Sequence, residues 1–216
     1  MKNSDVIFDI DGTLFDTKPG IFNALEDVFC EFKLGFFDRS LGDKYIGPPI
    51  IDSLIKFNNL SFEQASQATR YYRSVYVNKY ITDSMLYDGV LQLLHNFNEN
   101  GNRLSIATMK TCLQVDVLFN LFNIDRNLFY MVETASELNK TTKSQMLINI
   151  KNQVGHVDNI VMVGDTYGDF NASTKSGVDF IGVTYGYEFK SNIEYSFPVA
   201  DSVNDIYSLV NELFVE

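Results

Sequence analysis

Two aspartates follow the first apolar run of the chain, and their spacing could carry chemistry. Residues 6–8 (VIF) suit a buried strand, and Asp9 and Asp11 come directly after them, followed by Gly12. If the strand ends near Asp9, both acids lie at the carboxyl edge of a sheet, where open α/β sheets bind ligands. The pair could hold a hard cation such as Mg²⁺, which prefers oxygen ligands. The alternative is that both aspartates are turn residues.

A second acidic cluster follows another buried run. Residues 159–164 (NIVMVG) are followed directly by Asp165, and Asp169 comes four residues later. If a helix begins near Thr166, Asp165 is a candidate N-cap and Asp169 lies in the first turn, so both could merely cap that helix. If the two strands are neighbours, however, the four carboxylates of Asp9, Asp11, Asp165 and Asp169 converge on one cation.

Two further residues could bind phosphate. Residues 105–110 (SIATMK) predict a buried strand ending in Thr108, whose hydroxyl, with the backbone N–H groups that follow, could bind phosphate oxygens. A plain N-cap threonine is the alternative. Lys143 begins a predicted helix, where a cation is disfavoured, so its position indicates a local anion. A solvated surface lysine is the alternative, and Lys110 and Lys140 are competing candidates.

The elements that position these residues alternate between strands and helices. Apolar runs predict parallel strands buried on both faces, and most are followed by helical patterns. This alternation predicts an α/β doubly wound sheet. The strands are expected at 5–9, 103–108, 128–132, 159–164 and 179–183, with a short edge strand in 197–201. The helices are expected at 88–101, 141–153, 167–177 and 202–214.

One stretch interrupts the alternation. About seventy residues after the first strand carry no strand pattern. Helices are expected at 19–32 and 61–80, with a Gly-Pro-Pro loop and a third helix in 45–57 between them. We therefore predict a helical insert, residues 16–84, that leaves and rejoins the core near its two ends.

The composition narrows the class of protein. The chain has 216 residues, 45% of them hydrophobic, and a formal net charge of -11. This charge disfavours binding to nucleic acid and to anionic membranes, but a small phosphorylated metabolite needs only a local positive site. We see no membrane span or signal peptide and expect a cytoplasmic protein, with Cys30 and Cys112 as reduced thiols.

These motifs, in this order, resemble those of the haloacid dehalogenase (HAD) superfamily of phosphatases. The segment 9–13 (DIDGT) is similar to the family's first motif, Thr108 to its second, Lys143 to its third, and Asp165 with Asp169 to its fourth. The helical insert resembles the family's cap. The segments 46–49 (IGPP) and 181–188 (IGVTYGYE) resemble the phosphoglycolate-phosphatase-like branch. Two positions depart from that branch, because Met109 replaces a small polar residue and Ser144 replaces a frequent proline.

The resemblance implies a doubly wound, Rossmann-like parallel sheet core formed by residues 1–15 and 85–216, with a small helical cap domain at 16–84 inserted after the first strand. It also implies roles for individual residues. Asp9 would be the nucleophile and Asp11 the general acid and base. Mg²⁺ would be held by Asp9, the Asp11 backbone carbonyl and Asp165, with Asp169 completing or orienting the site.

The remaining expected roles concern phosphate and specificity. Thr108, Lys143 and the loop N–H groups at Met109 would bind the phosphate oxygens. The cap residues Tyr45, Gly47 and Pro48 are candidates for contacting the leaving group, although this loop could simply pack between cap helices. The cap would hinge near 16–17 and 82–83. The tyrosines of 71–80 are expected in the surface and core of the cap.

The resulting hypothesis is a Mg²⁺-dependent phosphatase that hydrolyses a small phosphate monoester and acts as a monomer or homodimer. Asp11 favours a phosphatase over a dehalogenase, because an alkoxide leaving group needs an acid and a halide does not. A nucleotidase, a pyrophosphatase, a sugar phosphomutase or a noncatalytic protein that retains the fold remain alternatives.

Overall fold

A computed structural model of the chain describes residues 4–136, 141–155 and 159–214. One parallel sheet of six strands has the order β5-β4-β1-β6-β7-β8. The strand bounds are β1 Asp5–Phe8, β4 Arg103–Thr111, β5 Phe129–Ala135, β6 Ile160–Gly164, β7 Asp179–Val183 and β8 Val199–Ala200. The chain runs outward from β1 to β5, then returns to β6 and runs outward on the other side. This order confirms the predicted doubly wound α/β fold, and β8 confirms the short edge strand.

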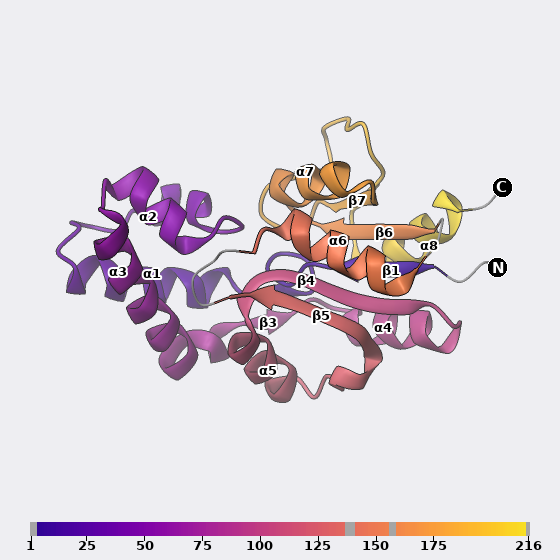
Figure 1. Cartoon of the computed structure of the whole chain (residues 1–216), viewed down its shortest axis with the longest axis horizontal. Coiled ribbons are helices and arrows are strands. Elements are labelled where there is room, and N and C mark those ends of the chain that lie inside the picture. The colour runs from indigo at the N-terminus through magenta and orange to yellow at the C-terminus, as the bar shows by residue number, and fades with distance from the viewer. Residues whose placement is uncertain (1–3, 137–140, 156–158, 215–216) are drawn as a thin grey trace.

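Helices cover both faces of the sheet (Figure 1). Their bounds are α4 Val90–Glu99, α5 Cys112–Leu121, α6 Lys143–Val154, α7 Tyr167–Ser176 and α8 Val203–Leu213. Successive residues of β1 alternate between the faces. Ile7 packs in the apolar cluster that includes α6 and α7, whereas Val6 and Phe8 pack in the cluster that includes α4, α5 and α8. Burial on both faces explains why these strands are continuous apolar runs.

The helical insert lies at one end of the molecule, opposite the two chain termini (Figure 1). It contains α1 Lys18–Glu31, α2 Ile50–Asn58 and α3 Phe62–Val75, with 3-10 helices at Arg39–Tyr45 and Ile81–Asp83 and a π-helix at Tyr76–Tyr80. Where the insert leaves and rejoins the core, β2 Phe15–Asp16 pairs antiparallel with β3 Met85–Leu86. The chain therefore crosses between the two parts on paired strands. The domain boundaries at 16 and 84 stay a prediction.

Some helix boundaries follow the predicted signals. Ser61 and Gln64 form the expected capping box at the start of α3. Gly101, with φ 79°, lies just beyond the C-cap of α4, as expected for a C′ glycine. The helix expected at 61–80 is instead divided into α3 and the π-helix. The π-helix spans only five residues, about one turn, which is too short for an apolar pattern to distinguish it from a continuing α-helix.

Other boundaries differ from the predictions. The strand expected to end at Thr108 continues to Thr111, and Thr111 forms a capping box with Gln114 at the start of α5, a helix that the sequence reading did not include. Similarly, Thr166 caps α7 and Asp165 does not. In both cases the chain offers two capping residues within three positions of each other, and the extent of strand pairing decides which one lies at the helix start. β5 also runs three residues beyond its expected end.

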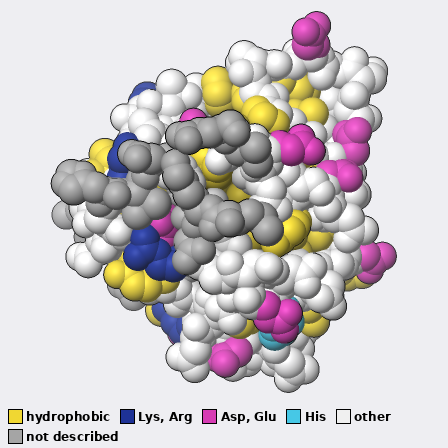
Figure 2. Space-filling view, turned by 90° about the vertical axis from the view of Figure 1, so that its right-hand side faces the viewer, with side chains coloured by type: hydrophobic (Ala, Val, Ile, Leu, Met, Phe, Trp, Pro, Cys, Tyr) yellow, Lys and Arg dark blue, Asp and Glu magenta, His cyan; other side chains and the backbone are white. Residues whose placement is uncertain are grey.

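The end of the molecule that carries the termini is shown in Figure 2. On this face the hydrophobic side chains form several separate groups, and acidic side chains are scattered along the margin. No helix in the described part of the chain is long and apolar enough to cross a membrane. The predicted functional residues lie at the opposite edge of the sheet, which faces the helical insert.

Candidate active site

Three carboxylates meet at the carboxyl edge of the sheet. β1 and β6 are parallel neighbours, with Phe8 paired to Val163, so Asp9 and Asp165 follow the two strands side by side. Asp169 lies in the first turn of α7, directly after β6. One oxygen from each carboxylate lies within 4.8 Å of the others, and all three residues are buried. The convergence predicted for these three aspartates is therefore present.

Burial and mutual repulsion favour the protonated forms of Asp9 and Asp165. Burial raises the pKa of Asp9 to about 7, with Lys143 lowering it and Asp169 adding to the increase. Burial also raises the pKa of Asp165 well above its ordinary value, and the charges of Asp169 and Asp9 add to that effect. Both shifts have the same physical origin, which is negative charge held away from water. A bound cation would remove that penalty.

The carboxylate of Asp165 is held on one side. Its Oδ2 accepts a hydrogen bond of 2.9 Å from the Tyr187 backbone N–H. The backbone at Gly12, with φ 75°, lies so close that a Cβ there would be 2.1 Å from the same oxygen. The other oxygen, Oδ1, is buried and has no hydrogen-bond partner among the described residues. A fixed carboxylate with one unpartnered oxygen is suited to ligating a cation.

Lys143 lies between two of the acids. It is the first residue of α6, and its Nζ lies 3.0 Å from Asp9 Oδ1 and 2.5 Å from Asp169 Oδ1. Burial lowers its pKa, but the two carboxylates outweigh burial and raise the pKa above its usual value. The predicted local anion is thus present, as carboxylate. The competing candidate Lys140 lies outside the described residues.

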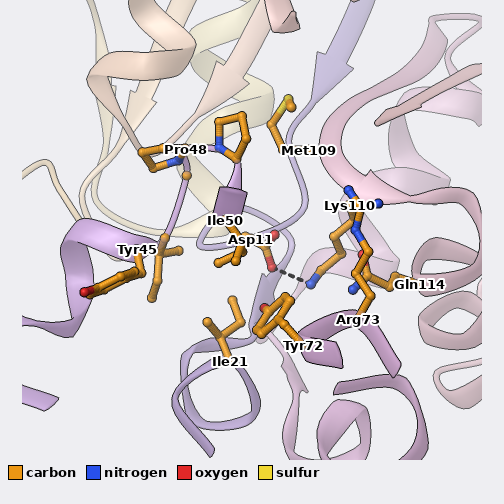
Figure 3. A pocket seen from close by; sticks show the side chains of 13 residues that line it. Asp11, Ile21, Tyr45, Pro48, Ile50, Tyr72, Arg73, Met109, Lys110 and Gln114 are labelled. Carbon is orange, nitrogen blue, oxygen red and sulfur yellow. Dashed lines mark ion pairs between the residues drawn. The ribbon is translucent and has the colours of Figure 1, made fainter. Parts of the chain in front are cut away.

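Asp11 does not join the other three carboxylates, contrary to the expectation that all four converge. Its Oδ1 lies 2.9 Å from Lys110 Nζ and also accepts a hydrogen bond from the Thr17 hydroxyl. Figure 3 shows the Asp11 and Lys110 side chains pointing toward each other. Gly12 allows the chain to turn here, so the two acids of the first motif face different surroundings. The predicted metal contact through the Asp11 backbone carbonyl stays a prediction.

Lys110 has buried partners that were not expected from the sequence, where it was a candidate only for binding phosphate. Its side chain is 4% exposed, and Nζ donates a 3.1 Å hydrogen bond to the Tyr76 hydroxyl. Burial lowers the pKa of Lys110, but Asp11 and then Tyr76 raise it above its usual value. The available signal was the position of Lys110 near the end of an apolar strand. Its partner Tyr76 is distant in sequence and could not be found that way.

The predicted phosphate-binding residues lie beside this group. Thr108 is completely buried, and its hydroxyl accepts a 3.3 Å hydrogen bond from the backbone N–H of Lys110. Met109 is half-buried and lines both cavities described below. Because β4 passes through these residues, Thr108 is not at a helix entry. Its role, and that of the Met109 backbone, stay predictions.

Two cavities lie between the helical insert and the core. The larger has a volume of about 590 Å³ and includes Lys143 and Asp169 in its lining. The smaller, of about 50 Å³, includes Asp11 and Lys110 and is drawn in Figure 3. The loop residues Gly47 and Pro48 line both cavities, so the Gly-Pro-Pro loop borders them on the side of the insert.

Tyr45 lines the smaller cavity but is held mainly by the insert. It is 4% exposed, and its hydroxyl donates a 2.8 Å hydrogen bond to Asn58. Its ring lies within 6.0 Å, centre to centre, of those of Phe29, Phe37 and Phe57. These contacts support the alternative that Tyr45 packs between the helices of the insert. Contact of this residue with substrate stays a prediction.

Tyr187 lies at the site, although nothing in the sequence singled it out. Its hydroxyl accepts hydrogen bonds of 2.8 Å from the Thr17 backbone N–H and 3.1 Å from that of Lys18. The same residue donates its backbone N–H to Asp165. Tyr187 therefore connects the acidic cluster to the start of α1, where the chain enters the insert.

Comparison with known proteins assigns this arrangement to a family. A family model described as "Haloacid dehalogenase-like hydrolase" matches residues 6–183. The chain belongs to the haloacid dehalogenase-like hydrolases. The match spans both acidic motifs, Lys143 and the whole insert, so it includes every residue of the candidate site except those at 184–188.

Several relatives of this HAD hydrolase are named as enzymes that hydrolyse phosphate esters. It is 25% identical over 188 residues to a 5'-nucleotidase of Pseudomonas aeruginosa, covering 87% of this chain and 85% of that protein. It is 26% identical over 198 residues to a phosphoglycolate phosphatase of Colwellia psychrerythraea, covering 87% of each. The crystal structure of a predicted phosphatase from Clostridium acetobutylicum aligns with a TM-score of 0.88 and 27% identity, covering 97% of this chain and 99% of that one.

These likenesses confirm three predictions from the sequence. The chain is a HAD superfamily hydrolase of the phosphoglycolate-phosphatase-like branch, its fold is the expected one, and it is a phosphatase.

Proposed function

We propose that the protein is a Mg²⁺-dependent phosphatase that hydrolyses a small phosphate monoester through an aspartyl-phosphate on Asp9. The observation that carries this proposal is the separation of two kinds of acid at one sheet edge. Asp9, Asp165 and Asp169 form a buried cluster, whereas Asp11 stands apart with a cationic partner. One group suits a metal and nucleophile, and the other suits proton transfer.

The residues present fit a magnesium ion. If ionised, the three clustered carboxylates and Lys143 leave two negative charges, and Asp165 Oδ1 has no described hydrogen-bond partner. Asp9, Asp165 and Asp169 would hold the ion through oxygen, the ligand type that Mg²⁺ prefers. When bound, the ion would supply positive charge that reduces the repulsion between the nucleophile and a phosphate dianion.

The reaction has two steps at the side chains of this chain. Asp9 attacks phosphorus and forms an acyl phosphate while the bond from phosphorus to the leaving oxygen breaks, and Asp11 gives that oxygen its proton. Asp11, now a carboxylate, then takes a proton from water. That water attacks the phosphorus, releases Asp9 and yields inorganic phosphate.

Phosphate binding follows from the groups around Asp9. Lys143, already 3.0 Å from Asp9, would stay charged and attract the phosphate oxygens. Thr108 and the backbone N–H of Met109 would add hydrogen-bond donors from β4. The HAD family includes both phosphatases and dehalogenases. Asp11 favours ester hydrolysis in this chain, because an alkoxide leaving group needs a proton from an acid and a halide does not.

The similar proteins suggest two classes of phosphate ester as substrates. Phosphoglycolate is the first candidate, because the chain resembles a phosphoglycolate phosphatase. A nucleoside 5'-monophosphate is the second, since a 5'-nucleotidase is similar over 87% of the chain. The larger cavity, about 590 Å³, lies within the range of roughly 300–1,000 Å³ that holds small ligands. It shares Gly47, Pro48 and Met109 with the smaller cavity that Asp11 lines, so an ester whose leaving oxygen meets Asp11 would extend into it.

A substrate panel tests the proposal. Phosphate release would be measured with phosphoglycolate, sugar phosphates, nucleoside monophosphates and pyrophosphate, each with Mg²⁺ and with a chelator. The Asp9→Asn variant, which keeps the size of the side chain, is run in parallel. We expect turnover that requires both Mg²⁺ and Asp9. Turnover that persists in Asp9→Asn, or no turnover of any ester, would contradict the proposal.

A further inference from the structure

Lys110 is a buried cation whose partners come from two parts of the molecule. Its Nζ lies 2.9 Å from Asp11 Oδ1, 3.1 Å from the Tyr76 hydroxyl and 4.4 Å from the centre of the Tyr76 ring. A buried ammonium is stable only where such partners replace water. Asp11 follows β1 in the core, whereas Tyr76 belongs to the helical insert. Lys110 therefore connects the insert to the proposed acid.

Tyr76 is held firmly within the insert, so its hydroxyl places Lys110 according to where the insert packs. It is completely buried and begins the π-helix that follows α3, a rare conformation that occurs frequently at functional sites. Its hydroxyl also lies 3.3 Å from the hydroxyl of Ser84, where the insert returns to the core. The ring of Tyr72 stacks on the ring of Tyr76, with the ring centres 5.9 Å apart. The Tyr76 hydroxyl is thus fixed by packing as well as by hydrogen bonds.

The contacts of Asp11 are concentrated on one oxygen. Both Lys110 and the Thr17 hydroxyl bind Oδ1. In Figure 3 the second carboxylate oxygen points away from Lys110. The orientation of the carboxylate is therefore set by the partners of Oδ1, and Oδ2 is the oxygen left for the leaving group in the adjoining cavity that Asp11 lines.

We propose that Lys110 and Tyr76 are positioning residues that hold Asp11 Oδ1, so that Oδ2 meets the leaving-group oxygen. Because Tyr76 belongs to the helical insert, the acid is aligned while the insert packs against the core as in this structure. The inference rests on the proposed role of Asp11 as the general acid. Lys110 and Tyr76 transfer no proton and need not touch the substrate. Misplacement of an acid by about 1 Å can cost up to about 100-fold in rate.

Tyr76→Phe is the first test, because it removes one hydroxyl and keeps the ring. Lys110→Met removes the charge and keeps an unbranched side chain. The matched control is Tyr80→Phe, in the same π-helix, whose hydroxyl donates a 3.2 Å hydrogen bond to Asp27 away from the site. The rate of the first turnover would be measured with phenyl phosphate and with 4-nitrophenyl phosphate, both with Mg²⁺. Nitrophenolate leaves without a proton, whereas phenolate leaves better when protonated.

We expect Tyr76→Phe to slow the first turnover of phenyl phosphate by about tenfold, and Lys110→Met by more, because an acid contributes roughly 10²–10⁴ in rate. The rate with 4-nitrophenyl phosphate should stay within about twofold of wild type, as should both rates in Tyr80→Phe. Equal losses on the two esters would mean a merely structural role and would overturn the inference, as would an unchanged rate with phenyl phosphate.

Asp11→Asn separates this inference from the function it rests on. If Asp11→Asn slows phenyl phosphate selectively and the Tyr76 and Lys110 variants do not, the positioning role is wrong and the proposed function stands. If Asp11→Asn shows no such selectivity, Asp11 is not the acid and both are overturned. Should Lys110→Met fail to fold, Tyr76→Phe alone decides.

Discussion

At the scale of single residues, the account depends on carboxylates whose surroundings differ. Asp9 and Asp165 are buried among other acids, and the pKa of each is raised. Asp11, only two residues after Asp9, is paired with Lys110 instead. Proximity in sequence therefore does not give the two acids of the first motif the same chemistry. Different partners allow one to act as a nucleophile and the other to exchange a proton.

The raised pKa of Asp9 predicts how stability depends on pH without metal. The pKa is about 7 in the folded protein and 3.8 for the ordinary side chain, so between these values the folded state binds more protons than the unfolded chain. Stability should therefore fall as the pH rises from about 4 to about 7. The free energy of unfolding in a chelator, measured across this range, would show the slope.

Asp9→Asn is the control for this slope, since the amide does not titrate, and it should make the slope shallower. The raised pKa of Asp165 acts in the same direction and would leave the remaining slope. Adding Mg²⁺ to the wild-type protein should stabilise it more as the pH rises, because the metal needs ionised ligands. A wild-type slope that Asp9→Asn leaves unchanged would show that other groups cause it.

The backbone at Gly12 predicts a second effect. A Cβ there would lie 2.1 Å from Asp165 Oδ2, and the residue has φ 75°. Gly12→Ala should lower the free energy of unfolding by the cost of the left-handed backbone, about 1–2 kcal/mol, and by about 1–3 kcal/mol more for the clash. It should also weaken Mg²⁺ binding, because Asp165 must move. Denaturant unfolding and a Mg²⁺ titration followed by calorimetry would measure the two effects.

Gly35→Ala provides the matched control, because Gly35 has φ 88° and no atom within 4 Å of the added Cβ. It should lose stability only through the backbone conformation and keep Mg²⁺ affinity. Equal effects of the two substitutions on Mg²⁺ affinity would argue against the proposed position of Asp165.

At the scale of elements, the start of α7 determines where Asp169 lies. The Thr166 hydroxyl donates a 2.7 Å hydrogen bond to Asp169 Oδ2, and the two residues form a capping box. The same carboxylate binds Lys143 through its other oxygen. The cap of the helix and the acidic cluster therefore share one side chain.

Thr166→Ala should reduce both helix stability and metal binding. The lost cap should cost about 1 kcal/mol of unfolding free energy, and the lost partner of Asp169 should weaken Mg²⁺ affinity by about tenfold. Ser61→Ala removes a similar capping box from α3, outside the site. It should cost similar stability and leave Mg²⁺ affinity unchanged, as calorimetry would show. Unchanged affinity in Thr166→Ala would mean that Asp169 does not need its cap partner.

The strands were largely predictable from the sequence, whereas contacts between the insert and the core were not. Apolar runs and turn residues predicted every strand of the parallel sheet, and the neighbouring positions of β1 and β6 brought Asp9 and Asp165 together as expected. The predicted end of β4 was wrong. Thr108 and Thr111 can each act as a helix N-cap, and only the extent of strand pairing distinguishes them. The Lys110 contact with Tyr76 could not be predicted, since it depends on how the insert packs against the core.

At the scale of the whole molecule, the proposed chemistry depends on two parts of the chain. The sheet edge supplies the acidic cluster, Lys143 and Asp11, and the Gly-Pro-Pro loop of the helical insert lines the cavities beside Asp11, Lys143 and Asp169. Contacts between the two parts converge on the proposed acid, Asp11. Tyr76 reaches it through Lys110, and Thr17 binds it directly. If Lys110 and Tyr76 position Asp11 as proposed, an insert that contributes no acid to the cluster still affects the rate.

The most direct test of the central claim is to locate the covalent phosphate. The protein would be mixed with 4-nitrophenyl phosphate and Mg²⁺, quenched in acid within the first turnover, and digested for mass spectrometry. The account predicts phosphate on the peptide that contains Asp9, dependent on Mg²⁺ and absent in Asp9→Asn. Turnover without phosphate on Asp9, or with phosphate on a different residue, would contradict it.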